Sequence, residues 1–425
     1  MRTTTMGMVG VAAVFAGCTT GGSKGLVCDA SAPGGVSVAV VGADGAPADN
    51  AVALFDEAGA AVGVLRDGES LTELPGGRYL YEVLRETGST VGATDFGVGE
   101  LCIGGADAEI AVEVGTQPAA GALWAASWET VHVFPATEGA ARLEPAASLS
   151  FPLTNSFGGI AMDRTGALWA AAAPTYGARF VALPAGALTG AGEVAPALEL
   201  VAPSLVGSTN FTSLSFDGDG NAWATAAPLL GGFVGVVGWS AAALREARLL
   251  GGVVEVEPTW AGTVEGITGL NGGAVDAAGD LWATSADEQA VFRVSAEVLR
   301  GATGGVEGAP ALPTAGRIRP VDDGGNPYRG VDGVTFGEDG LLYVLAAVSG
   351  AILSVPTSVV DGGDVEIAAL QLGVTALPTG LAGDGAGGTW WSDTAEVGHV
   401  SAGGGDGVRI DAPALERAGA ILHAR

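Results

Sequence analysis

The chain has 425 residues, of which 47 are acidic and 18 are basic, and its formal net charge is −29. A charge of this sign repels nucleic acid and anionic lipid head groups, and the single lysine, Lys24, offers no basic cluster that would bind either. The hydrophobic content of 48% is ample for folded cores, so we predict two or three globular domains and no nucleic-acid partner. The acidity permits cationic partners, although it also serves simply to keep the surface soluble.

The amino terminus has the features of an export signal. Arg2 gives a weakly positive start, and Met6–Ala16 is an apolar run too short to span a membrane as a mature helix. The residues Phe-Ala-Gly-Cys at 15–18 resemble the lipobox of bacterial lipoproteins, with Phe where Leu is usual. The resemblance implies removal of residues 1–17 as a signal peptide and lipid on Cys18. The alternative is an ordinary secretory signal in which Cys18 is incidental.

The residue after Cys18 is Thr19 rather than Asp. By the sorting rule of enteric bacterial lipoproteins, this implies the outer membrane. We therefore expect a lipid-anchored protein of the bacterial cell envelope, on the periplasmic face or at the cell surface. Residues 18–26, which are rich in Gly and polar side chains, would serve as its flexible tether.

Residues 27–116 are predicted to form a small β-sandwich. Their short strands are VSVAVVG, AVALFDE, RYLYEVL and EIAVEVG, with Gly-rich turns between them. The turn and strand at Leu74–Val83 resemble the transthyretin-like and carboxypeptidase-regulatory-like sandwiches of bacterial surface proteins, which implies a spacer or a binding arm. Cys28 and Cys102 are an even pair in an exported chain, which predicts a disulfide that closes a loop of about 75 residues and contributes roughly 4 kcal/mol.

A motif returns along the chain from residue 117 on. Alternating residues are followed by an acidic residue, small residues and Gly, and then by a strand centred on an aromatic residue, most clearly in GIAMDRTGALWAAA at 159–172. This pattern predicts a hairpin with a tight turn, in which the glycine takes a positive φ. The turn glycines are Gly166, Gly220, Gly279, Gly340 and Gly387, and the aromatic positions are 124, 169, 223, 282, 343 and 390.

The spacing of the aromatic positions, 45 to 61 residues, is typical of propeller blades of about four strands. Six copies predict an all-β fold in which a six-bladed β-propeller over residues 117–425 follows the sandwich. The first copy lacks its first strand, and GAILHAR at 419–425 aligns with that missing strand. We therefore expect 419–425 to close the ring beside 121–127, the alternative being a terminal helix from Ala412.

The motif D-x-x-G-x-L-W-A, as in Asp163–Ala170 and Asp276–Ala283, resembles that of the six-bladed group of NHL-repeat, gluconolactonase-like and streptogramin-lyase-like proteins. The motif is specific for a fold rather than for a function, because its Asp and Trp are structural. The turn aspartates are therefore expected to cap their own turns: Asp163, Asp217, Asp276 and Asp384. The stretch at 217–221 also resembles the start of a calcium loop, but it lacks the downstream Glu of an EF-hand.

Propellers bind ligands at the mouth of the central channel, where the residues that precede each innermost strand converge. The repeat alignment places eight polar residues there: Ser156, Asn210, Thr212, Asn271, Asp332, Thr379, Glu416 and Arg417. Such a ring could hold a cation or a small polar ligand. Alternatively, these are polar loop residues at a wet mouth with no specific role.

The longest insertion, residues 301–330, is predicted to reach the same rim. Its polar residues stand on an Ala- and Gly-rich background, which suits a lid or a partner contact, the alternative being a disordered decoration. The candidate residues are Arg317, Arg319, Tyr328 and Arg329.

The sequence favours a non-catalytic propeller that binds a protein, a glycan or a small molecule, and it predicts no catalytic residue and no required cofactor. The gluconolactonase-like resemblance implies the alternative, a metal-dependent hydrolase in which a divalent cation polarises a lactone carbonyl. The metal ligands at the mouth would then be Asp332, Asn210, Asn271 and Glu416. A streptogramin-type lyase needs a general base, usually His, and His132, His399 and His423 lie away from the mouth as aligned.

Overall fold

The computed structural model describes the parts of the chain in which its strands, helices and turns are placed. These are residue 28 and residues 32–85, 91–93, 95–116, 122–127, 129–135, 144–151, 157–172, 179–189, 192–207, 209–228, 232–337, 340–357, 363–374, 380–383, 389–393, 396–401, 408–412, 415 and 418–423. The predicted signal peptide, Cys18 and the tether lie outside the described residues, so they stay predictions. Within these residues the fold is all-β apart from two short α-helices and two 3-10 turns.

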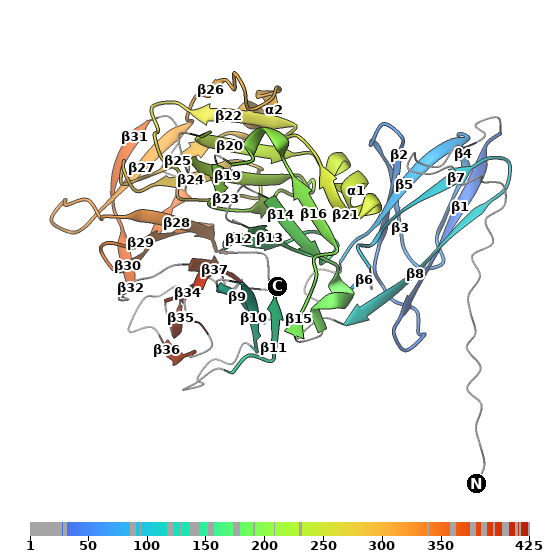
Figure 1. Cartoon of the computed structure of the whole chain (residues 1–425), viewed down its shortest axis with the longest axis horizontal. Coiled ribbons are helices and arrows are strands. Elements are labelled where there is room, and N and C mark those ends of the chain that lie inside the picture. The colour runs from blue at the N-terminus through green and yellow to red at the C-terminus, as the bar shows by residue number, and fades with distance from the viewer. Residues whose placement is uncertain are drawn as a thin grey trace, which may run out of the picture.

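The described residues between 28 and 116 form the amino-terminal unit, in which two four-stranded sheets pack around one core (Figure 1). One sheet has the order β4 (Ser70–Leu74), β1 (Gly34–Gly42), β8 (Ala108–Thr116) and β6 (Val91–Ala93), and the other β3 (Ala61–Leu65), β2 (Val52–Asp56), β5 (Gly77–Val83) and β7 (Val98–Ile103). The predicted disulfide is confirmed, because Cys28 and Cys102 are bonded with their Cα atoms 5.3 Å apart. The likeness to transthyretin-like sandwiches stays a prediction.

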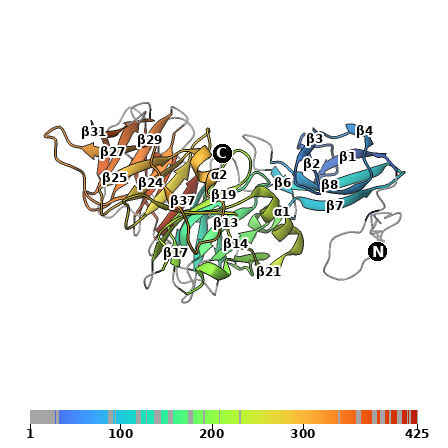
Figure 2. The ribbon, with the colours of Figure 1, turned by 90° about the horizontal axis from the view of Figure 1, so that it is seen from above.

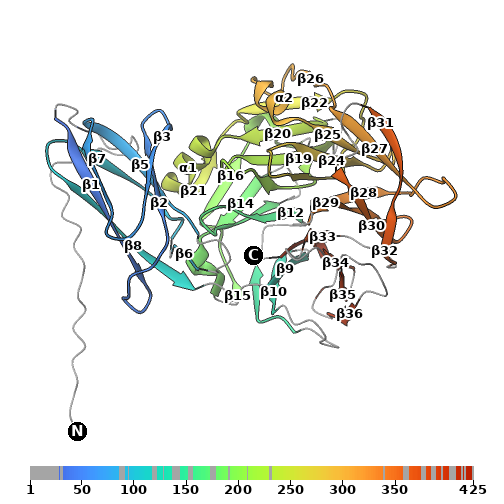
Figure 3. The ribbon, with the colours of Figure 1, turned by 180° about the vertical axis from the view of Figure 1, so that it is seen from behind.

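The rest of the described chain forms a β-propeller of six sheets (Figure 3). From the innermost strand outward, sheet 1 has β37 (Ala418–His423), β9 (Leu123–Ser127), β10 (Thr130–Phe134), β11 (Ala147–Ser150) and β15 (Gly192–Glu193). Sheet 2 has β12 (Phe157–Met162), β13 (Leu168–Ala172), β14 (Arg179–Leu183), β16 (Leu198–Val201) and β21 (Gly252–Glu255). Sheet 3 has β17 (Thr209–Phe211) and β18 (Ser215–Phe216) as one interrupted inner strand, then β19 (Ala222–Pro228), β20 (Gly235–Trp239), β22 (Trp260–Val264) and β26 (Ala311–Leu312).

The last three sheets continue the pattern. Sheet 4 has β23 (Gly272–Val275), β24 (Leu281–Ser285), β25 (Ala290–Val294), β27 (Gly316–Val321) and β31 (Asp364–Ala368). Sheet 5 has β28 (Val331–Phe336), β29 (Leu341–Ala346), β30 (Ala351–Pro356) and β32 (Leu370–Val374), and sheet 6 has β33 (Gly380–Gly383), β34 (Thr389–Ser392), β35 (Glu396–Val400) and β36 (Val408–Asp411). The innermost strands contact one another in a closed ring, in the order β37, β12, β18, β23, β28 and β33.

The carboxyl-terminal strand closes this ring. β37 pairs antiparallel with β9, with Leu422 opposite Trp124 and His423 opposite Leu123. β37 is thus the inner strand of sheet 1, as β12, which pairs with β13, is the inner strand of sheet 2. The repeat alignment predicts this pairing of β37 with β9. A sheet joined in this way by both ends of the propeller leaves no unpaired inner edge at β9.

The motif aromatics fill the spaces between adjacent sheets. Trp169 of sheet 2 lies in one buried cluster with Phe211 and Trp239 of sheet 3, and Trp282 of sheet 4 lies with Val344 of sheet 5. The last gap is closed in the same way, because Trp390 of sheet 6 packs with Ala125 of sheet 1. One large ring per repeat thus bridges each sheet to the next and builds a continuous core around the axis.

The turn aspartates Asp163, Asp217 and Asp276 cap their own turns as predicted and also bind the aromatic residue of the motif, whereas Asp384 lies outside the described residues. Asp163 Oδ1 accepts from the backbone N of Thr165 at 2.8 Å and of Ala167 at 3.1 Å, while its Oδ2 accepts from Trp169 Nε1 at 2.8 Å. The other two described copies repeat this bond: Trp223 Nε1 to Asp217 Oδ2 at 3.2 Å and Trp282 Nε1 to Asp276 Oδ2 at 2.9 Å. The bonds from Asp219, Asn221 and Trp223 occupy both oxygens of Asp217, so turn formation accounts for the stretch that resembles a calcium loop.

The glycine of each turn adopts the predicted positive φ in every described copy. The φ angles are 83° at Gly166, 84° at Gly220, 85° at Gly279 and 74° at Gly340, and Gly387 lies outside the described residues. The first copy lacks a hairpin turn because its inner strand comes from the carboxyl terminus. Accordingly, Trp124 Nε1 is buried and has no hydrogen-bond partner among the described residues.

An unpredicted regularity concerns the outer edges of the sheets. The segment between the third and fourth strands of one sheet adds a fifth, parallel strand to the sheet before it: β15 joins β11, β21 joins β16, β26 joins β22 and β31 joins β27. Each such strand covers an edge that would otherwise present unpaired backbone groups. It also ties neighbouring sheets together at their outer rim as the aromatics do nearer the axis.

Two helices follow third strands of the propeller. α1 (Ala241–Leu250) begins after Ser240 and α2 (Ala296–Gly301) after Ser295, and each serine hydroxyl accepts from a backbone N of the first turn. The short turns η1 (Ala185–Thr189) and η2 (Pro203–Leu205) lie on either side of β15 and β16. α1 faces the amino-terminal unit, which stands beside the propeller (Figure 2). Among the described residues, no helix has the length and apolar character needed to cross a membrane.

Replacing Gly158 by alanine is expected to destabilise the protein by roughly 1–3 kcal/mol. A Cβ there would lie 1.8 Å from the backbone O of Phe211, in the inner strand of the next sheet, which cannot rotate away. Gly218→Ala is the matched control, because a Cβ at that position meets no atom within 4 Å. Thermal melts should show a clear loss for Gly158→Ala and a change within experimental error for Gly218→Ala. Equal melting temperatures would show that the inner strands do not approach as closely as described.

Candidate functional site

The innermost strands surround a cavity of 1480 Å³ on the axis of the propeller. Much of its wall is backbone, because these strands carry glycines where they approach one another. The glycines that line the cavity include Gly158, Gly159, Gly272, Gly273 and Gly333. At Gly272 a Cβ would lie 2.4 Å from the backbone O of Asp332. The absence of side chains therefore allows close strand contact and leaves the channel open.

Three of the eight predicted mouth residues line this cavity, namely Thr212, Asn271 and Asp332. A fourth, Asn210, lies in β17 but is not part of the cavity wall, and its Oδ1 is buried without a hydrogen-bond partner among the described residues. The other four lie outside the described residues: Ser156, Thr379, Glu416 and Arg417.

Asp332 is the second residue of β28, at the end of the channel where the inner strands begin. Its backbone O accepts from Thr284 Oγ1 at 2.7 Å, which ties β28 to sheet 4. Its carboxylate has no hydrogen-bond or ion-pair partner within the described part of the chain, and burial raises its pKa above the ordinary value. A partly buried carboxylate that gains no protein partner is stabilised by any cation or donor that enters the cavity.

The side chains of Thr212 and Asn271, in contrast, form hydrogen bonds to other residues of the propeller. Thr212 Oγ1 lies 2.8 Å from Thr225 Oγ1 and donates to Leu270 O at 3.2 Å. Asn271 Oδ1 accepts from the backbone N of Ala286 at 3.2 Å. The bond from Ala286 engages the oxygen with which Asn271 would bind a metal, and no group of three or more His, Cys, Asp or Glu side chains gathers among the described residues.

The insertion at 301–330 does not bring its predicted rim residues to the cavity, and the prediction that they share a rim with Asp332 is corrected. Arg317 and Arg319 lie in β27, which runs between β25 and β31 in the outer half of sheet 4. Arg317 donates to Glu288 Oε2 at 2.6 Å and Arg319 pairs with Glu366 at 3.5 Å. Tyr328 donates to Gln371 Oε1 at 3.4 Å, and the backbone N of Arg329 donates to Ser349 Oγ at 2.8 Å.

A residue that the sequence analysis missed completes the cavity. Arg85 of the amino-terminal unit lines it, with Nη1 3.4 Å from Met162 Sδ and with its backbone N donating to Arg164 O at 2.7 Å. Burial lowers the pKa of this guanidinium, and the nearby Asp163 opposes that shift. No carboxylate forms an ion pair with Arg85 in the described part of the chain. Nothing in the repeat could reveal this residue, because Arg85 belongs to the other unit.

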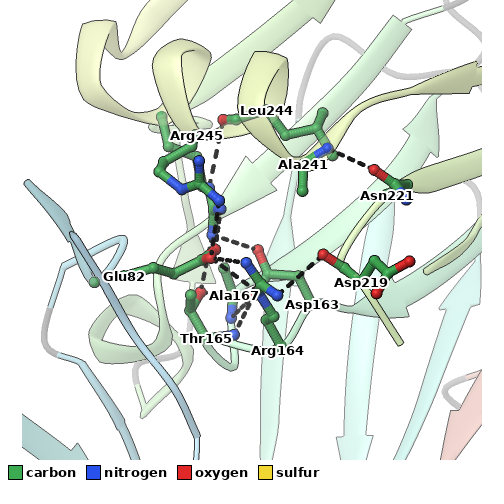
Figure 4. Close-up of polar contacts among 12 residues, drawn as sticks. Glu82, Asp163, Arg164, Thr165, Ala167, Asp219, Asn221, Ala241, Leu244 and Arg245 are labelled. Atoms are coloured by element: carbon green, nitrogen blue, oxygen red, sulfur yellow. Dashed lines mark hydrogen bonds and ion pairs between the residues drawn. The ribbon is translucent and has the colours of Figure 1, made fainter. Parts of the chain in front are cut away.

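The two units meet at a buried group of charges, which we call the interface cluster: Glu82, Asp163, Arg164, Arg245 and Arg248. Figure 4 labels the first four of these residues. The Glu82 carboxylate, 1% exposed, is bonded to Arg248 through Oε1 and to Arg164 through Oε2, with Arg164 Nε at 2.9 Å. Arg248 Nη1 also donates to Asp163 Oδ2 at 3.0 Å, so the cluster includes a turn-capping carboxylate of the repeat. Burial raises the pKa of Glu82, but the charges of Arg248, Arg164 and Arg245 outweigh burial and lower it to about 2.

Arg245 is held differently from its neighbours in the cluster. Its guanidinium carbon lies 3.5 Å from the centre of the Phe55 ring, a cation–π contact between α1 and β2 of the amino-terminal unit. Its Nε and Nη1 are buried and have no hydrogen-bond partner among the described residues, and burial lowers its pKa to about 10. Phe55 and Leu80 also pack near Leu249 of α1, so apolar contacts surround the charges.

No known family model matches the sequence, and no curated protein is similar to it. Among solved structures, the chain is similar to a streptogramin B lyase, with a TM-score of 0.37 and 15% identity over 61% of this chain and 69% of that one. It is also similar to a protein of unknown function from Bacteroides caccae, with a TM-score of 0.43 and 9% identity over 72% of this chain and 100% of that one. A catalytically inactive virginiamycin B lyase from Staphylococcus aureus, with quinupristin, has a TM-score of 0.33 and 13% identity over 62% of this chain and 72% of that one. These values are too low to support an argument about activity or ligand.

Proposed function

We propose that this protein is a lipid-anchored, extracytoplasmic six-bladed propeller that binds a ligand with a protonated amine in its central channel, without catalysing a reaction. The observation that carries the proposal is the Asp332 carboxylate, which lines a cavity of 1480 Å³ and has no partner among the described residues. An ammonium group supplies both the positive charge and the hydrogen-bond donors that such a carboxylate lacks.

Two further features support an amine ligand. The net charge of −29 raises the concentration of cations near the whole surface and thus favours their encounter with the channel. The side-chain oxygen of Asn271, one of the residues that would hold a metal, already accepts a hydrogen bond within the protein, which favours simple binding over metal-assisted hydrolysis at this mouth. The membrane anchor rests on the lipobox-like sequence at 15–18 and on lipid at Cys18, with the outer membrane as its site.

Asp332→Asn is expected to weaken the binding of tetraalanine amide, which carries one ammonium group and no carboxylate, by about tenfold or more. Isothermal titration calorimetry with the full-length chain measures this directly. Affinity for the wild type should also fall as the pH is lowered through the Asp332 pKa, which burial places above its ordinary value of 3.8. Protonation then removes the charge that the ammonium binds.

Asp323→Asn is the matched control, because it removes the same charge from an exposed residue that does not line the cavity. Its affinity should equal that of the wild type. Equal weakening by both substitutions would indicate a general charge effect, and a wild type that binds no amine at all would refute the proposed function.

A further inference from the structure

Two charges of opposite sign that have no ion-pair partner among the described residues line the same cavity, and they come from different units. Asp332 belongs to the propeller and Arg85 to the amino-terminal unit. Most other arginines that are at least partly buried in the described chain contact a carboxylate: Arg78, Arg164, Arg179, Arg245, Arg248, Arg293 and Arg317. In a chain with a net charge of −29, a cavity-lining guanidinium without such a contact is an exception that needs an explanation.

The register of the inner strands shows how the two charges are arranged. β12 and β28 have six residues each, the same irregularity near their first residue and equivalent last pairs, Met162 with Leu168 and Phe336 with Leu342. Arg85 contacts Met162 at the end of β12, whereas Asp332 is the second residue of β28. The two levels are therefore four residues apart along an inner strand, or roughly 13 Å at about 3.3 Å per residue.

The ring order places the charges on opposite walls as well as at opposite ends. From β12 to β28 the closed ring has three steps in either direction, through β18 and β23 or through β37 and β33. A small ligand near one charge cannot reach the other. A ligand that satisfies both must be elongated, with a positive group at one end and a negative group at the other.

We infer that the channel binds the two ends of a short extended peptide, with its α-ammonium at Asp332 and its α-carboxylate at Arg85. This inference rests on the proposed function and adds the second anchor, the direction and the length of the ligand. About four residues is the minimum length, because an extended chain of four covers only the roughly 13 Å between the two levels along the axis. Several of the lining residues are glycines, which leaves room for a peptide backbone.

The amino-terminal unit is thus part of the binding site rather than a spacer. The backbone next to Arg85 is fixed from both sides: Leu84 N donates to Ala51 O at 2.7 Å, and Asn50 Nδ2 donates to Leu84 O at 3.0 Å. The interface cluster then joins Glu82, three residues before Arg85, to the propeller. These contacts fix the backbone of Arg85 beside the channel, so no backbone ordering is needed when a carboxylate binds.

The test compares tetraalanine, tetraalanine amide, acetyl-tetraalanine and dialanine by calorimetry on the full-length chain. Removing either terminal charge of tetraalanine should weaken binding by about tenfold or more, and dialanine should bind no better than a singly charged peptide because it cannot reach both ends. The Arg85→Gln variant should bind tetraalanine and tetraalanine amide with equal affinity. The Asp332→Asn variant should bind tetraalanine and acetyl-tetraalanine with equal affinity. Arg66→Gln, at an exposed residue outside the cavity, is the matched control and should behave as the wild type.

The outcomes separate the two proposals. If tetraalanine and its amide bind equally well to the wild type, the proposed contact between the peptide carboxylate and Arg85 is wrong, while amine binding at Asp332 stands. If none of the four peptides binds, both proposals are wrong. This comparison of ligands on the wild type decides the question even if the Arg85→Gln variant folds poorly.

Discussion

Glu82→Gln is expected to lower the free energy of unfolding by about 3–5 kcal/mol. The substitution keeps the shape of the side chain but removes the only carboxylate that contacts Arg164, Arg245 and Arg248 together in the described structure. Arg245 and Arg248 then stay buried without the negative charge of Glu82, and Arg245 already has two buried nitrogens without a hydrogen-bond partner among the described residues. Urea denaturation followed by tryptophan fluorescence measures the loss, because every tryptophan lies beyond residue 116 in the sequence.

The matched control is Glu246→Gln. Glu246 also pairs with an arginine across the junction of the two units, Arg78 at 3.0 Å, but its side chain is 43% exposed. Solvent screens such a pair, so its loss should cost less than about 1 kcal/mol. Equal effects of the two substitutions would mean that burial of the cluster contributes nothing to its strength.

The effect of Glu82→Gln should depend on pH in a defined direction. The pKa of Glu82 is lowered from 4.5 to about 2 in the folded protein, so the folded state binds fewer protons than the unfolded state between these values. The stabilisation is therefore complete above about pH 5 and is lost as the pH falls through about 2, by an amount on the order of 3 kcal/mol. The difference between wild type and variant should shrink accordingly in acid, and a constant difference would contradict the assigned charge network.

Ending the chain after Arg417 is expected to cost about 5 kcal/mol or more, or to prevent folding. The truncation removes β37, the inner strand of sheet 1, together with its ladder to β9 and its contacts with β12 and β33. β9 would then present an unpaired inner edge, and the ring of inner strands would be open. Thermal melts should show a fall of more than about 10 °C or aggregation of the truncated chain.

Ending the chain after His423 is the matched control, because it keeps every residue of β37 and removes the last two residues. Its melting temperature should match that of the full chain. If the chain that ends after Arg417 melted at that same temperature, β37 would not be part of the ring in solution.

Local patterns predicted the repeat because the contacts that define it are local. The turn aspartate binds backbone groups two and four residues ahead and the tryptophan six residues ahead, as in Asp163, Ala167 and Trp169. The turn glycine needs a positive φ wherever it occurs. Even the closing strand could be found, because it is a copy of the same pattern displaced to the end of the chain.

The candidate site was predicted only in part. The residues before each inner strand could be aligned, which led to Asp332, but the alignment could not tell an engaged side chain from an unpartnered one. Asn271 and Thr212 lie at the same mouth, yet their bonds to Ala286 and Leu270 depend on how neighbouring sheets meet. The rim prediction was wrong for Arg317 and Arg319 because polar composition does not show that a segment pairs as an outer strand.

By itself, the sequence determined the all-β repeat, its turns, the aromatic core positions and the Cys28–Cys102 pair, since each follows from short-range geometry or from composition. Tertiary structure alone decided which charges meet. Glu82 lies 166 residues from Arg248 and 82 residues from Arg164 in the sequence. The residues next to them in the sequence do not indicate that these side chains pair. Arg85 likewise reaches the cavity that Asp332 lines only once the two units fold and dock, because long-range burial, not local pattern, determines which polar groups lose water and need a partner.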